Sequence, residues 1–393
     1  MQNPVKESIV IVGAKRTPIG AFNGSLAAHS APELGAIAIR AAVAQAGVDP
    51  ASVDEAIMGL CLFAGVGQAP ARQAVLGAGL PTSTPATTLS KMCGSGMKSV
   101  MLAHDLLLAG TCNVAVAGGM ESMTNAPHIV PRGRHGYRLG HGQLLDHMYC
   151  DGLEDAYEGH LMGHYADLAA AERGIGREAQ DAYARESLQR AQAAVAQGRF
   201  RIEIAPVALK RGGELAQDET PGQCDADKLP KLKAVFRSGG TVTAGNASSI
   251  SDGAAALVLM RESDARRQGL APLARIVAHA THANPPQRFA DAPVQAARRV
   301  LDKAGWTARD VDLYEINEAF AVVTMIALDE LGIGHDRLNV NGGACALGHP
   351  VGATGARLLV TLLHALKQRG GQRGLASLCL GGGEAVAVGV ELC

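Results

Sequence analysis

The chain has few aromatic residues, almost no net charge and no long apolar run, and each shortage excludes a class of protein. Aromatic residues make up 3% of the 393 residues and hydrophobic residues 47%, so Ala, Val, Leu and Ile must build most of a globular core. A formal net charge of −1 argues against a nucleic-acid partner, because phosphate binding needs a basic surface. No stretch is apolar for the roughly 20 residues that a membrane helix needs, so no membrane partner is expected.

The sequence also lacks paired cysteines. Its eight cysteines include no CxxC pair, which predicts neither a disulfide framework nor a structural zinc site. The first stretch, MQNPVKESIVIVGAKRTPIG, resembles neither a signal peptide nor an Arg- and Ser-rich presequence. We therefore expect a cytoplasmic protein in which single cysteines are available for chemistry.

An internal repeat is the strongest pattern that is present. AVAQAGVDPASVDEAIMG in the first half resembles RVLDKAGWTARDVDLYEINEA in the second, and Ala46 and Ala304 lie 258 positions apart, as do Val53 and Val311. Helical periodicity over 358–366 and a short apolar run at 113–117 predict helices alternating with buried strands. We expect two similar α/β halves with mostly parallel sheets covered by helices.

Residues 122–247 have no counterpart in the repeat and are more polar, which predicts an insertion in the first half. The insertion is rich in histidine between positions 135 and 164. Only His160 and His164 have helical i,i+4 spacing there, and no glutamate lies between them as in an HExxH zinc motif. The sequence therefore predicts no metal site.

Two cysteines and one histidine lie where predicted elements begin or end. Cys93, in KMCGSGMKS, precedes a helix whose positive end and unpaired N–H groups favour a thiolate; the alternative is a small buried apolar residue. Cys379 ends a strand before three glycines, and His349 lies in NGGACALGHPV, whose glycines we expect to let the backbone approach a ligand; the alternative is a tight turn. A nucleophile, a base and a glycine-lined oxyanion site would support acyl transfer.

Six motifs in order along the chain resemble the thiolase family, in particular its acetyl-CoA acetyltransferase (acetoacetyl-CoA thiolase) branch: CGSGMK, AGGMESMTNAP, GTVTAGNASSISDGAAALVLM, NEAFA, NVNGGACALGHPVGATGAR and CLGGGEA. The resemblance implies a duplicated α/β fold, a five-layer αβαβα core of two similar halves with an inserted loop domain that binds coenzyme A. The expected boundaries are 1–121 with 248–272 for the N-terminal half, 122–247 for the insertion and 273–393 for the C-terminal half.

The resemblance also implies catalytic roles. Cys93 takes up the acyl group and His349 activates it. Cys379 removes the α-proton of the second acetyl group in condensation and returns a proton in thiolysis. Asn317, from NEAFA, holds a water that shares with His349 the stabilisation of the enolate oxygen, and the N–H groups of Cys93 and Gly381 form a second oxyanion hole.

The implied substrates are acyl-CoA esters, with coenzyme A and acetyl-CoA as substrates and no permanently bound cofactor. Ser248 is the expected partner of the pantetheine amide, with Ala244, Leu153 and Met162 along the channel. Lys231 is one of four basic residues of the segment DKLPKLKAVFR, with Lys228, Lys233 and Arg237, among which partners of the CoA phosphates are expected; the alternative is a solvated amphipathic stretch.

Phe289 resembles a residue of the acyl pocket, and its size would favour short acyl groups, whereas Leu161 replaces a histidine that acetoacetyl-CoA enzymes usually carry before Met-Gly and so favours longer or branched ones. A broader-chain 3-ketoacyl-CoA thiolase of β-oxidation is therefore the alternative. Two other interpretations are less favoured. One is a decarboxylating ketoacyl synthase, which would have a second histidine where this chain has Asn317. The other is a non-catalytic acyl-CoA-binding protein. Residues 132–145 resemble the loop that pairs dimers into a homotetramer, and Tyr183 resembles a position near a potassium site in some relatives.

Overall fold

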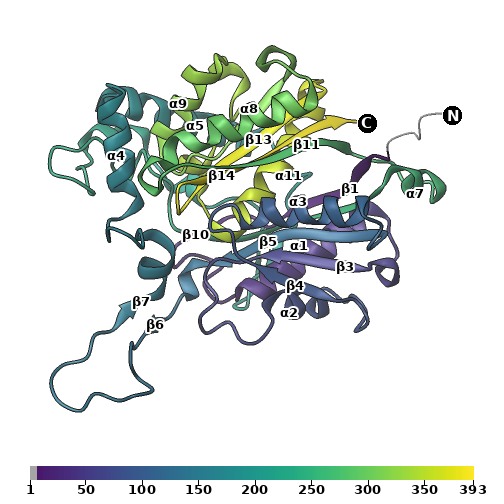
Figure 1. Cartoon of the computed structure of the whole chain (residues 1–393), viewed down its shortest axis with the longest axis horizontal. Coiled ribbons are helices and arrows are strands. Elements are labelled where there is room, and N and C mark those ends of the chain that lie inside the picture. Colours follow the sequence, from purple (N-terminus) through teal and green to yellow (C-terminus); the bar gives the residue numbers. More distant parts are fainter. Residues whose placement is uncertain (1–6) are drawn as a thin grey trace.

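The structure is a computed structural model that describes residues 7–393. Two predictions depend in part on residues 1–6: that the chain has no presequence, and that the first half begins at residue 1. Residues 1–6 lie outside the described residues. Figure 1 shows two α/β halves, one in purple and blue and the other in green and yellow, with the insertion in teal beside them.

Each half contains a mixed β-sheet, and the two sheets have the same order over four strands, with β4 as an additional edge strand in the first. The first half follows β1 (Ile9–Arg16), β10 (Ser251–Arg261), β5 (Val114–Ser122), β3 (Glu55–Gly59) and β4 (Ala86–Leu89). The second half follows β11 (Ala274–Ala283), β14 (Glu384–Leu392), β13 (Arg373–Leu380) and β12 (Leu313–Ile316). Strands β1 and β11 pair at Val10–Arg275 and Ile11–Ala274, which joins the two sheets.

The expectation of mostly parallel sheets is wrong. Only β3 with β4, β3 with β5, and β12 with β13 are parallel, whereas β1, β10, β11 and β14 pair antiparallel with their neighbours. The glycine turn at 381–383 folds β13 directly back on β14 as a hairpin. Alternation of strands and helices predicts which segments are strands, but it does not fix the direction of strands that a tight turn connects.

Helices form three layers around the two sheets. Helices α1 (Ala31–Ala46) and α2 (Pro70–Gly77) cover the outer face of the first sheet, and α8 (Ala292–Ala304) and α9 (Ala321–Leu331) that of the second. Helices α3 (Ser95–Leu108) and α11 (Val351–Arg369) lie between the sheets. The expected five-layer αβαβα core is thereby confirmed, and the repeat is visible in detail, since α1 and α8 both end at a left-handed glycine, Gly47 and Gly305.

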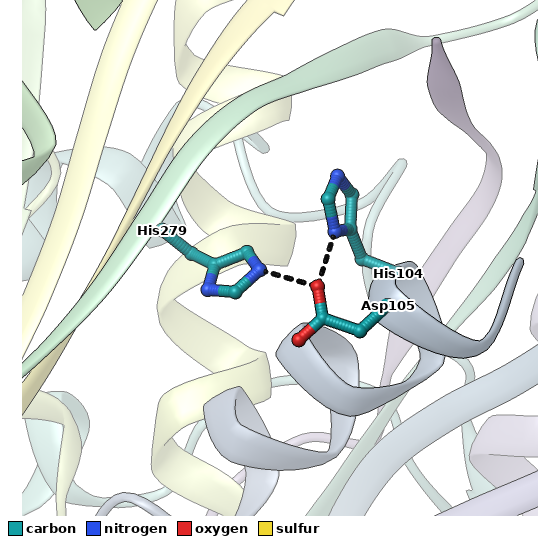
Figure 2. Close-up of side chains that lie close together, drawn as sticks. All are labelled: His104, Asp105 and His279. Carbon is teal, nitrogen blue, oxygen red and sulfur yellow. Dashed lines mark hydrogen bonds and ion pairs between the residues drawn. The ribbon is translucent and has the colours of Figure 1, made fainter. Parts of the chain in front are cut away.

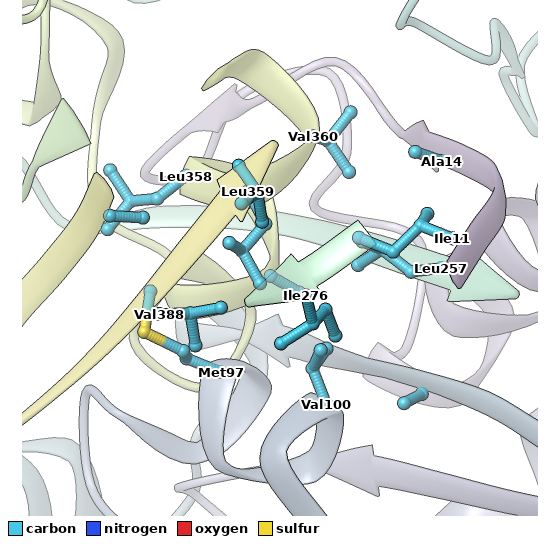
Figure 3. Close-up of a cluster of buried hydrophobic side chains, with 14 of the residues drawn as sticks. Ile11, Ala14, Met97, Val100, Leu257, Ile276, Leu358, Leu359, Val360 and Val388 are labelled. Carbon is cyan, nitrogen blue, oxygen red and sulfur yellow. The ribbon is translucent and has the colours of Figure 1, made fainter. Parts of the chain in front are cut away.

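The central layer holds the largest core. Figure 3 shows Met97 and Val100 of α3 and Leu359 of α11 packed among Ile276 and Val388 from the second sheet. Helix α11 is buried from Val351 to Leu366, which explains why its apolar residues are not confined to one stripe.

Helices α3 and α11 approach each other closely near their N-termini. A Cβ atom on Gly96 would lie 2.9 Å from the backbone nitrogen of Ala356, and one on Gly355 would lie 2.5 Å from that of Met97. Only glycine permits this contact, and it brings together the residues that precede the two helices, Cys93 and His349.

The segment between β5 and β10 contains two longer helices, α4 and α5, and several short elements. In chain order they are β6 (His128–Ile129), β7 (Leu145–Asp146), a π-helical turn (Tyr149–Leu153), α4 (Met162–Glu172), α5 (Arg177–Ala196), β8 (Val207–Ala208), β9 (Glu214–Leu215), α6 (Thr220–Gln223) and a 3₁₀ helix (Ala226–Lys231). Helix α5 packs against α9 and α10 (Ala344–Leu347) of the second half, whereas Val207 of β8 and Leu215 of β9 pack against the core of the first half. The loop between β6 and β7 extends away from the body (Figure 1), and Leu139 on it is fully exposed. Within residues 7–393, every helix is too short or too polar to cross a membrane.

Candidate active site

One cavity of about 470 Å³ collects four of the five predicted catalytic residues. Cys93, His349, Cys379 and Gly381 all line it. The fifth, Asn317, is fully buried beside them, with its Nδ2 3.5 Å from Nε2 of His349. The cavity therefore joins residues from both halves of the repeat.

Cys93 lies on a constrained turn before α3. The preceding residue, Met92, has a φ of 48°, a left-handed conformation that costs a non-glycine residue about 1 kcal/mol or more. Burial raises the pKa of the Cys93 thiol to about 11, against the opposing effect of the backbone N–H groups of Gly381 and of Cys93 itself. The predicted thiolate is therefore wrong for the resting protein, because desolvation outweighs the helix end and the two N–H donors.

The hydrogen bonds of His349 define its tautomer. Its Nδ1 lies 2.6 Å from Oγ1 of Thr354, and that hydroxyl donates to the carbonyl oxygen of Pro350 at 2.8 Å. The hydroxyl has one proton, so it must accept from Nδ1–H, which leaves the lone pair of Nε2 facing the amide of Asn317. Burial, and next the positive charge of Arg357, lower the pKa of His349 to about 3, so the resting imidazole is neutral.

Cys379 lies at the end of β13 and is 1% exposed. Burial, and next the neighbouring Cys93, raise the pKa of its thiol well above the ordinary value. Asn317 has a buried Oδ1 with no hydrogen-bond partner among the described residues, so the acceptor capacity of this oxygen is unused.

The glycines around His349 do not do what the sequence suggested. None of Gly342, Gly343 and Gly348 lines the cavity. The space that their side chains would occupy is taken by Ser187, Glu318 and Ser251, respectively, and Gly342 and Gly348 have φ values of 82° and 104°. The expectation that they let the backbone approach a ligand is therefore wrong: they let the loop pack against the protein and so fix His349.

Sequence reasoning missed Glu318, which anchors this loop. Its buried carboxylate accepts hydrogen bonds from Tyr183 Oη (2.9 Å), Ser187 Oγ (2.7 Å), Asn339 Nδ2 (2.9 Å) and the backbone nitrogen of Cys345 (3.1 Å). Its position beside Asn317 in NEAFA was the available signal.

A second buried carboxylate, Glu121 in the motif AGGMES, was also missed. It accepts from the backbone N–H groups of Cys61 (3.0 Å), Leu62 (3.3 Å) and Gly352 (2.9 Å), the last at the start of α11. Burial raises the pKa of Glu121 to about 7 despite these three donors.

The residues expected to bind coenzyme A divide into two groups. Six of them line the cavity: Leu153, Leu161, Met162, Ala244, Ser248 and Phe289. Lys231 does not line it; its side chain is exposed at the end of the 3₁₀ helix, and the cavity is reached only farther along the same segment, by Val235 and Phe236.

The histidine-rich part of the insertion forms no compact group, although the rings of His160 and His164 stack at 4.1 Å. Within residues 7–393, three residues lie close enough to share a metal ion, and they are elsewhere: His104, Asp105 and His279.

Fold and pocket together define the class: a duplicated five-layer α/β protein in which two cysteines and a histidine face one cavity. Comparison with known families agrees. Residues 9–263 match the thiolase N-terminal domain and residues 270–392 the thiolase C-terminal domain. The chain therefore belongs to the thiolase family.

Curated relatives are similar over nearly their whole length. An acetyl-CoA acetyltransferase of Chromobacterium violaceum is 52% identical over 98% of this chain and 99% of its own. Proteins of the same name from Cupriavidus necator and Schizosaccharomyces pombe are 49% and 45% identical, each over 98% of this chain and 99% of their own.

Proposed function

We propose that this chain is an acetyl-CoA C-acetyltransferase that catalyses the reversible condensation of two acetyl-CoA to acetoacetyl-CoA and CoA through an acyl-cysteine intermediate. The observation that carries the proposal is the convergence of Cys93, His349 and Cys379 on one cavity. The names of the similar proteins support the same reaction.

Acylation of Cys93 is the first step. Nε2 of His349 takes the thiol proton as the sulfur attacks the thioester carbonyl of acetyl-CoA, and the carbonyl oxygen faces the N–H groups of Cys93 and Gly381. Cys379 gives its proton to the departing CoA sulfur. The products are acetyl-Cys93, a Cys379 thiolate and an imidazolium at His349.

Carbon–carbon bond formation follows from those protonation states. The Cys379 thiolate removes an α-proton from the second acetyl-CoA, and the enolate oxygen faces Nε2–H of His349 and a water held by Asn317. The carbanion attacks acetyl-Cys93, and collapse of the adduct expels the Cys93 sulfur, which regains its proton from His349. Every proton is thereby returned to its starting group.

For coenzyme A, we propose that Ser248 and Ala244 contact the pantetheine, with Leu153 and Met162 along the channel, and that Lys231 meets a phosphate beyond the cavity mouth. The exposed position of Lys231 suits a phosphate that remains in solvent. No permanently bound cofactor is required by this chemistry.

A second candidate function, broader-chain 3-ketoacyl-CoA thiolysis, is favoured by one observation. Leu161 gives the cavity an apolar wall where the family resemblance leads us to expect a histidine, and an apolar wall favours longer or branched acyl groups.

We further propose a homotetramer that pairs through the extended loop 132–145, a cytoplasmic location and the domain boundaries given above. The exposed Leu139 and Leu144 in the loop supply apolar contacts for a second copy. The eight cysteines, none in a disulfide, suit a reducing compartment. Light scattering of the full chain that gave only dimers would contradict the tetramer.

The experiment that tests the function measures CoA-dependent loss of 3-oxoacyl-CoA over a chain-length series that starts at acetoacetyl-CoA, with Cys93→Ala as the control. Activity confined to the four-carbon substrate supports the acetyltransferase. Activity that extends to longer chains selects the broader thiolase, and a folded protein that binds CoA without any turnover would exclude both.

A further inference from the structure

Three potential metal ligands meet where the two halves join. His104 and Asp105 lie near the end of α3 in the first half, and His279 lies on β11 in the second. Figure 2 shows both imidazole rings directed at the same carboxylate oxygen of Asp105. Oδ1 of Asp105 is 3.0 Å from Nδ1 of His104 and 2.9 Å from Nε2 of His279.

The spacing of these atoms suits a small divalent cation. Zn²⁺ binds imidazole nitrogen and carboxylate oxygen at about 2.0–2.1 Å, so two ligands of a tetrahedral site lie about 3.3 Å apart. Two edges of the triangle are within a few tenths of an ångström of that length, and all three ligand atoms lie within 4.8 Å of one another. A small rotation of the imidazole rings would complete the site.

The surroundings leave the site both ordered and open. The two histidine side chains are largely buried, at 12% and 17% exposed, whereas Asp105 is 53% exposed and leaves a path to solvent.

We infer that His104, Asp105 and His279 form a binding site for one divalent transition-metal ion, Zn²⁺ being the best match, that links helix α3 to strand β11. Two imidazoles and one carboxylate are ligands that Zn²⁺ accepts, with a fourth position left for water. Each imidazole nitrogen that now donates to Asp105 must present its lone pair instead, which a neutral ring does by moving its proton to the other nitrogen. A bound ion would link the two halves at the end of α3 that lies away from Cys93. The site is independent of the proposed reaction.

The test is titration of the chelator-washed full chain with Co²⁺, followed by visible absorption, because cobalt held by nitrogen and oxygen ligands lacks the intense thiolate band that Cys93 or Cys379 would produce. We expect one ion per chain without a thiolate band, and a metal-dependent rise in Tm with Zn²⁺. His279→Gln should lose both, whereas His164→Gln, which alters the stacked histidine pair in the insertion, should keep both.

Two further variants protect the test against misfolding. His104→Asn removes one ligand on the helix, and Asp105→Asn keeps the shape of the side chain while removing its charge. Each variant should abolish the metal-dependent rise in Tm. Each should also keep the thiolase activity of the wild type in the absence of metal. The inference is overturned if the wild type binds no cobalt outside the thiols, or if folded, active His279→Gln binds the same number of ions.

Discussion

The hydroxyl of Thr354 accepts a hydrogen bond from Nδ1 of His349 at 2.6 Å and thereby determines which nitrogen of the imidazole faces the cavity. Thr354 is one of the first residues of the buried helix α11, so the base is oriented by an element that cannot shift without disturbing the core. Thr354 is thus a positioning residue for the proposed base.

Replacing Thr354 with valine should lower kcat/KM about 10–100-fold, the loss seen when a hydrogen-bond partner that orients a metal-binding histidine is removed. Valine matches the shape but cannot accept from Nδ1–H, so the ring can adopt the other tautomer. Thr354→Ser should restore most of the activity. A steady-state comparison across pH checks the prediction, and equal kcat/KM in the valine variant and the wild type would contradict it.

His349 should make the protein sensitive to acid. Its folded pKa of about 3 lies below the unfolded value of about 6.5, so protonation favours the unfolded chain; the stability is intact above pH 6.5 and is lost as the pH falls toward 3. Between pH 7.5 and 5, the free energy of unfolding should fall by about 2 kcal/mol more in the wild type than in His349→Asn. Urea denaturation at the two pH values measures the difference, and parallel losses in both proteins would refute the assignment of the neutral ring.

Cys93 should react slowly with iodoacetamide at neutral pH. A thiol with a pKa of about 11 is only about 0.1% ionised at pH 8, compared with about 10% for one with a pKa of 9. The rate of alkylation should rise about tenfold per pH unit up to pH 10. Mass spectrometry of the Cys93 peptide separates it from the exposed Cys224 and Cys393, and a plateau below pH 8 would indicate a resting thiolate.

Glu318→Ala should destabilise the fold by about 3 kcal/mol or more, because it removes the acceptor of three buried donors and one partly buried donor at once. Glu318→Gln keeps the shape and one acceptor, so its loss should be smaller. Denaturant unfolding ranks the three proteins. Activity should fall in both variants, since the loop that holds His349 depends on this carboxylate.

Leu161→His tests what determines chain length. A polar side chain in the apolar wall should lower kcat/KM for a six-carbon 3-oxoacyl-CoA relative to acetoacetyl-CoA about tenfold, the scale on which pockets distinguish one or two methylenes. Leu161→Met is the matched control that keeps the wall apolar. An unchanged ratio in the histidine variant would remove Leu161 from the specificity argument.

The sequence predicted those parts of the fold that local patterns encode. The apolar run of β5 and the periodicity of α11 are local, and the repeat revealed that the halves are equivalent. Strand direction was predicted wrongly, because local patterns do not encode how consecutive strands are connected, as in the tight turn between β13 and β14.

The sequence predicted which residues form the site, but it did not predict their pKa values. Motifs identified Cys93, His349 and Cys379, which share one cavity, but the pKa of Cys93 depends on how much protein surrounds the sulfur. Glu318 contacts Tyr183 and Asn339, which lie far from it in the sequence, and His104 meets His279 across 175 positions. Such pairs carry no local signature.

The backbone contact between α3 and α11 has a consequence for how activity appears during folding. Cys93 precedes one helix and His349 precedes the other, so neither half contains a working pair, and the pair comes within reach only when Gly96 and Gly355 have brought the helices into contact. Recovery of enzymatic activity in a refolding experiment thus reports docking of the two halves. A protein in which each half has formed its secondary structure separately should still be inactive.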